Sequence, residues 1–126
     1  MKINRIKLVS LLLLLVSAAC AGGGTTKETR SPASDALLRA ARAGHADTVK
    51  TTLSAPDVNV NVKDENGSTP LIEAARAGHD DVVQALLVAR ADVKVRDNRS
   101  KTALMYASEG GHNEIVKLLR QAGAAE

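Results

Sequence analysis

The chain has 126 residues and a single aromatic side chain, one Tyr. A chain of this length allows one small domain, and its core must be filled by aliphatic side chains, which excludes a broad globular centre. The formal net charge of +3 equals the contribution of Lys2, Arg5 and Lys7; without them, basic and acidic residues balance at 14 each, which argues against nucleic-acid binding.

Segment 1–19 has the layout of a secretory signal peptide. Basic residues within 1–7 precede an apolar run, 8–19, that ends in small side chains. The run is shorter than the roughly 20 apolar residues that a membrane-spanning helix needs. We therefore expect this segment to direct export and to be removed.

The end of this run, Val16-Ser17-Ala18-Ala19-Cys20, resembles a bacterial lipoprotein signal, in which cleavage precedes a Cys that becomes lipidated. Cys20 is the only Cys, so it has no disulfide partner within the chain. Ser17 departs from the usual aliphatic residue, which leaves plain signal cleavage as the alternative. The resemblance implies a periplasmic protein that is anchored to a bacterial membrane by lipidated Cys20. Because Ala21 rather than Asp follows the Cys, it points to the outer membrane. The alternative is a soluble periplasmic or secreted protein.

The segment after the signal is rich in Gly and Thr and lacks apolar periodicity. Together with Cys20 it makes up residues 20–33, which we interpret as a flexible tether. A disordered terminus without a role fits the same residues. Only lipidation of Cys20 would make this segment a spacer.

One pattern recurs three times after the tether, and each copy ends in a Gly-His pair: Gly44-His45, Gly78-His79 and Gly111-His112. Repetition at a period of 34 and then 33 residues indicates a solenoid whose units bury their apolar faces against one another. The central copy also predicts a helix, with Thr69 as N-cap, Pro70 at the first helical position and Gly78 at the end.

We place the repeats at 34–61, 62–95 and 96–124. In the first repeat we expect helices over 35–43, capped by Ser34 or Asp35, and over 46–53. The last repeat ends in a helix whose open side carries Leu118, so we expect residues 102–122 to be the weakest part of the array.

The array resembles the ankyrin-repeat family. The resemblance is carried by Asp64-x-x-Gly67-x-Thr69-Pro70-Leu71, Ala74-Ala75, Gly78-His79, Val82-Val83, Leu86-Leu87 and Ala91-Asp92-Val93, with further copies from Asp97 to Ala124 and from about Ser34. It implies an all-α ankyrin-repeat solenoid with a β-hairpin finger between repeats. Ser100 stands where the family prefers Gly, so that turn is either strained or remodelled.

No set of side chains suggests a catalyst. His45, His79 and His112 recur at one position, but stacked helices lie about 8–10 Å apart, too far for one metal ion to join them. We expect these side chains to make hydrogen bonds at the turns instead. We predict neither enzyme activity nor a cofactor, a metal or a small-molecule substrate.

The resemblance implies that a protein partner binds the finger tips and the exposed positions of the first helix of each repeat. Those positions are Arg42, Lys63, Glu65, Asn66, Ser68, Arg76, Arg96, Asn98, Arg99, Lys101, Tyr106 and Glu109. Tyr106 alternatively packs against the neighbouring repeat. The basic residues of the second finger, opposed only by Asp97, favour a partner with an acidic patch, although they also suit a solvated turn.

We therefore predict an exported, membrane-anchored interaction module that binds another envelope protein. One alternative is an inhibitor, immunity protein or protective partner of a periplasmic enzyme such as a cell-wall hydrolase. The other is a structural linker within the envelope.

Overall fold

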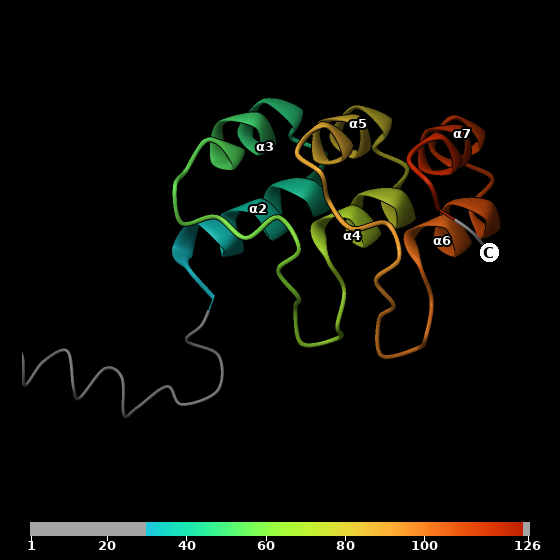
Figure 1. Cartoon of the computed structure of the whole chain (residues 1–126), viewed down its shortest axis with the longest axis horizontal. Coiled ribbons are helices and arrows are strands. Elements are labelled where there is room, and N and C mark those ends of the chain that lie inside the picture. The colour runs from blue at the N-terminus through green and yellow to red at the C-terminus, as the bar shows by residue number, and fades with distance from the viewer. Residues whose placement is uncertain (1–29, 125–126) are drawn as a thin grey trace, which may run out of the picture. The chain divides into compact units, whose positions relative to one another are not determined.

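The computed structural model describes residues 30–124, which form three pairs of helices (Figure 1). The helices are α2 (Pro32–Ala43), α3 (Ala46–Leu53), α4 (Pro70–Ala77), α5 (Asp80–Val88), α6 (Ala103–Glu109) and α7 (Asn113–Gln121). This part of the chain contains no β-strand. The prediction of an all-α solenoid of three helix-turn-helix repeats is confirmed. The predicted signal peptide, Cys20 and most of the tether lie outside the described residues.

The helices form two layers (Figure 1). An inner layer consists of α2, α4 and α6, which contact one another in that order, and an outer layer consists of α3, α5 and α7. Each inner helix also packs against the outer helix that follows it in the chain. The apolar face of every repeat is therefore covered mainly by its neighbours, as in other solenoids.

The inner helices begin at hydroxyl side chains that cap their first turns. Thr69 Oγ1 accepts a hydrogen bond from the Ile72 amide at 3.3 Å, and Thr102 caps α6 in the same way. The expectation for α2 was wrong, because Ser31 rather than Ser34 or Asp35 is the N-cap, and the helix begins at Pro32. The Ser-Pro pair repeats the Thr-Pro start of α4, since a hydroxyl cap followed by Pro suits a helix start.

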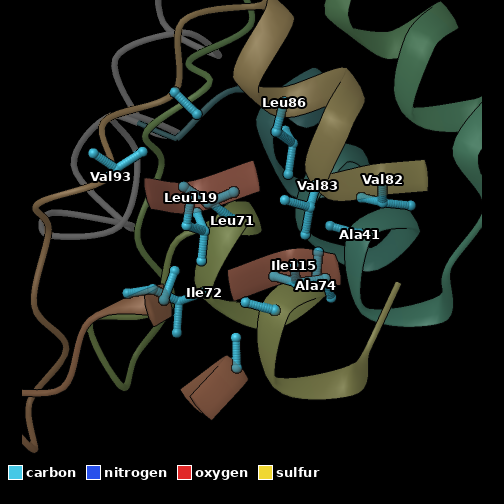
Figure 2. Close-up of a cluster of buried hydrophobic side chains, with 14 of the residues drawn as sticks. Ala41, Leu71, Ile72, Ala74, Val82, Val83, Leu86, Val93, Ile115 and Leu119 are labelled. Carbon is cyan, nitrogen blue, oxygen red and sulfur yellow. The ribbon is translucent and has the colours of Figure 1, made fainter. Parts of the chain in front are cut away.

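The core between the layers is aliphatic (Figure 2). Val82, Val83 and Leu86 of α5 are fully buried, and they meet side chains of the inner layer such as Leu71 and Ala74. Small Ala residues on the inner helices let the neighbouring backbones approach closely. The core thus forms without a Phe or Trp anywhere in the chain.

Two long loops project from the inner layer on the side away from the outer helices (Figure 1). They occupy the positions of the predicted β-hairpin fingers, but they contain turns instead of strands. In the second finger, Asp97 Oδ1 accepts hydrogen bonds from the amides of Arg99 and Lys101 at 2.9 and 3.0 Å. Asp64 makes the equivalent bonds in the first finger. Each finger is therefore a turn that is held by backbone hydrogen bonds and by one aspartate side chain, without a strand.

Ser100 keeps the left-handed conformation that the turn requires, with φ of 62°. Its counterpart in the first finger, Gly67, has φ of 74°. Of the two alternatives predicted from the sequence, the strained turn is therefore the one adopted. The two fingers also contact each other, because the backbone amide of Asn98 donates a hydrogen bond to the backbone carbonyl of Asn66 at 2.9 Å.

Within residues 30–124, none of the helices is both long and apolar enough to span a lipid bilayer.

Candidate functional site

The inner layer and the two fingers carry the residues predicted to bind a partner. Most of these side chains are exposed: Arg42, Lys63, Glu65, Asn66, Arg76, Arg96, Asn98, Arg99 and Glu109. Ser68 and Tyr106 are covered by the fold, with exposed fractions of only 1% and 8%. The prediction for these two residues needs correction, because buried side chains offer little surface to a partner.

A buried glutamate joins the first two repeats. Glu73 Oε2 accepts hydrogen bonds from Arg42 Nε at 3.0 Å and from Arg76 Nη2 at 2.9 Å. Arg42 also reaches the base of the first finger, where its Nη2 lies 3.1 Å from Asp64 Oδ2. The hydrogen bond and charge of Glu73 raise the pKa of Arg42. Arg42 therefore links two inner helices and a finger.

Glu73 was not among the residues predicted to bind a partner. It lies within the apolar stretch at the start of α4 and is 1% exposed. Its second oxygen, Oε1, is buried and accepts no hydrogen bond from the described part of the chain. The sequence signal that could have identified Glu73 was a charged residue inside an apolar helical face, since a buried carboxylate needs hydrogen-bond or ion-pair partners.

Tyr106 joins α6 to the second finger. Its hydroxyl donates to Asp97 Oδ2 at 2.5 Å, and this hydrogen bond raises the pKa of Tyr106. Burial acts to raise the pKa of Asp97, but the hydrogen bonds from Tyr106 and from two backbone amides outweigh it and lower that pKa. The charged groups of Arg76 and Lys101 lie 5.9 and 5.3 Å from the centre of the Tyr106 ring. Tyr106 is thus packed between repeats, the alternative that the sequence had left open.

The second finger is less basic than the sequence suggested. Lys101 Nζ forms an ion pair with Glu109 at 2.7 Å, so Asp97 is not the only acidic residue that opposes this group. Arg96 donates to the Ser100 carbonyl at 2.8 Å, while Arg99 remains exposed at the tip. The sequence alone could not identify Glu109 of α6 as the partner of Lys101, because the two side chains meet only where the finger loop folds back onto the helix.

Two of the recurring histidines, His79 and His112, connect successive repeats. His79 packs its ring over Gly44 of the preceding repeat, and its Nε2 lies 3.3 Å from the Arg42 carbonyl oxygen. His112 packs over Gly78 in the same way. Among residues 30–124, no group of three His, Cys, Asp or Glu side chains is arranged to hold a metal ion. The hydrogen bond of His79 fits the structural role expected for these residues.

A comparison against protein families agrees with the repeat period, with the helix boundaries at Thr and Gly, and with the two-layer stack. A family model described as ankyrin repeats (3 copies) matches residues 37–125. The chain belongs to the ankyrin-repeat family. A search of the curated proteins gave no match. The ankyrin repeats identify the chain as a protein–protein interaction module and indicate a protein partner.

The ankyrin array also has a groove on its outer layer, between α3 and α5. Its volume is about 1200 Å³, and Lys50, Leu53, Ala85 and Val88 are among the residues that line it. Val88 is 79% exposed. None of the residues predicted to bind a partner lines this groove, so a residue in the groove can serve as the control position when the partner-binding surface is mapped.

Proposed function

We propose that this ankyrin-repeat protein is exported, is lipidated at Cys20 and binds another protein of the cell envelope. The partner contacts the inner layer and the fingers. The observation that supports this surface most directly is the side-chain network from Asp64 through Arg42 and Glu73 to Arg76. It fixes charged side chains of two repeats at the surface, and fixed side chains lose less conformational entropy when a partner binds.

Site-specific photocrosslinking in intact cells tests the binding surface. A photoreactive residue replaces Asn66 or Arg99, which are exposed on the two fingers, and captured proteins are identified by mass spectrometry. The matched control replaces Lys50 in the outer groove. A protein captured from the fingers but not from Lys50 supports the proposal. Capture only from Lys50 would place the partner on the other layer and contradict it.

The anchor is tested separately. Cys20→Ser removes the thiol that lipidation requires, so the variant should move from the membrane fraction to the soluble periplasmic fraction. Ser17→Leu restores the usual signal pattern and should leave the protein in the membrane fraction. Unchanged fractionation of Cys20→Ser would contradict lipidation without affecting the binding proposal.

Charge reversal separates binding from simple linkage within the envelope. Arg96→Glu with Arg99→Glu should reduce the yield of the crosslink from Asn66, because rim charges set association rate and selectivity. Lys101 is left unchanged, since its replacement would break the ion pair with Glu109. A crosslink of unchanged yield would show that the second finger does not select the partner.

A further inference from the structure

Arg42 and Arg76 occupy equivalent positions at the ends of α2 and α4, and both donate to the same oxygen atom. Arg42 Nε lies 3.0 Å from Glu73 Oε2, and Arg76 Nη2 lies 2.9 Å from it. Because the two nitrogens share this acceptor, they cannot be further apart than these two distances combined. The two guanidinium groups, called here the guanidinium pair, are therefore held next to each other.

The guanidinium pair faces solvent while its anchor is buried. The side chains of Arg42 and Arg76 are 54% and 48% exposed, whereas that of Glu73 is 1% exposed. Glu73 Oε1 has no hydrogen-bond donor within residues 30–124. Release of either arginine would leave this buried carboxylate with still fewer donors, which is strongly unfavourable. The pair should therefore keep its position when a partner approaches.

Both arginines retain hydrogen-bonding capacity. A guanidinium has five N–H donors in a planar fork. In the described part of the chain, Arg42 uses its Nε and Nη2 atoms, and Arg76 uses its Nη2 atom. The remaining donors belong to half-exposed groups, so an acceptor on another molecule can reach them.

We propose that the guanidinium pair binds the carboxylate of an Asp or Glu side chain on the partner protein, with Glu73 as a positioning residue. The planar fork of Arg matches a carboxylate in two-bond geometry, and charge-assisted bonds of this kind are strong and directional. Asp64 and Glu73 balance the charges of Arg42 and Arg76, so geometry rather than a long-range field selects the ligand. This inference rests on the proposed function, because it names the partner group that the inner layer recognises.

The probe is a hexaglutamate peptide added to the purified full-length chain, with nuclear magnetic resonance detection of the arginine Nε–H signals. The Arg42 and Arg76 signals should shift and saturate, while the signal of Arg39, an exposed residue of α2, should not. A hexaglutamine peptide should shift none of them. Saturation by inorganic phosphate at a lower concentration than by the peptide would overturn the proposal in favour of a phosphate site.

Two variants separate geometry from charge. The double variant Arg42→Lys, Arg76→Lys keeps both charges but loses the planar forks, so hexaglutamate should bind about fivefold or more weakly. Arg39→Lys with Arg90→Lys is the matched control, because both residues are exposed and neither was predicted to bind a partner, and it should bind within about twofold of the original chain. Unchanged binding by Arg42→Lys, Arg76→Lys would overturn the proposal.

Glu73→Gln tests the positioning role, because charge and geometry predict opposite results. Removal of a negative charge should strengthen binding of an acidic peptide if attraction alone matters. If Glu73 positions the pair, the variant should instead bind hexaglutamate more weakly. Circular dichroism verifies that Glu73→Gln is folded; if it is not, the lysine double variant decides.

The inference and the proposed function can fail independently. Capture of a partner from the fingers, without any shift of the Arg42 and Arg76 signals, would refute the inference and leave the proposed function intact. Saturable peptide binding at the pair, without a crosslinked partner in cells, would refute the envelope partner and leave the carboxylate site.

Discussion

At the scale of single residues, Ser100 is a position where the sequence and the backbone disagree. Its φ of 62° is unfavourable for a side chain with a Cβ atom. We expect Ser100→Gly to raise the free energy of unfolding by about 0.5–1 kcal/mol, measured by urea denaturation. Ser54→Gly is the control, because Ser54 has φ of −80° and the replacement should destabilise the protein. A loss of stability in Ser100→Gly would show that the turn is not strained.

Tyr106 provides the donor that Asp97 Oδ2 needs. Tyr106→Phe keeps the ring near Arg76 and Lys101 but removes the hydroxyl, which leaves a buried carboxylate oxygen without this hydrogen bond. We expect the free energy of unfolding at neutral pH to fall by about 1–3 kcal/mol. Unchanged urea denaturation would mean that water replaces the hydroxyl at no cost.

The lowered pKa of Asp97 predicts how this loss depends on pH. Because the folded pKa lies below the ordinary 3.8, ionised Asp97 stabilises the fold fully above that value, and the contribution is lost as pH falls through the folded pKa. The stability difference between the original chain and Tyr106→Phe should therefore be constant between about pH 5 and 8 and shrink in more acidic solution. Urea denaturation at a series of pH values measures it. A difference that grows in acid would contradict this assignment.

At the scale of helices and turns, the contact between Gly and the next His couples the repeats. An added Cβ at Gly78 would lie 2.6 Å from the ring of His112, whereas at Gly111 nothing lies within 4 Å. Both glycines are left-handed, with φ of 82° and 73°. The two positions therefore differ mainly in the His contact.

We expect Gly111→Ala to lower the free energy of unfolding by about 1–2 kcal/mol through backbone strain. Gly78→Ala should add an overpacking penalty of about 1–3 kcal/mol. His112→Ala in the Gly78→Ala background should recover part of this loss. Equal destabilisation by the two glycine variants in urea would show that the His ring moves aside freely.

Helix positions could be predicted because their signals are local. The limits of α3 follow from the Gly44-His45 turn and the break after Leu53, and α4 follows from its Thr-Pro start. The early start of α2 was available in Ser31-Pro32, but the preceding Gly-rich stretch suggested a tether. The finger turns were predicted correctly in place but not in type, since the chain forms turns without strands and Asp side chains add hydrogen bonds to those of the backbone.

The candidate site was harder to predict because several of its pairs depend on how separate segments meet in the folded array, and those of Arg42 join different repeats. Arg42 and Glu73 are 31 residues apart, and only the stacking of α2 on α4 brings them together. The Lys101 pair with Glu109 depends likewise on the path of the finger. Composition showed that the charges balance, but the identity of the balancing partners is a property of the assembled array.

At the scale of the whole molecule, stability should vary along the stack. The central helices α4 and α5 are contacted by both neighbouring repeats, whereas α6 and α7 are contacted from one side. In a solenoid, each repeat gains its stability largely from such interfaces. Repeat 3 also has the shortest of the described helices, α6. Its Gly111, unlike Gly44 and Gly78, is not covered by a His ring.

Native-state hydrogen exchange measures this gradient residue by residue. Amides within 69–89 should open with a free energy close to that of global unfolding, and amides within 102–122 should open more easily because the last repeat can detach alone. Ser100→Gly, which acts at the start of the last repeat, should raise protection in 102–122 more than in 69–89. Equal protection of the two segments in the original chain would instead indicate that the three repeats unfold as one cooperative unit.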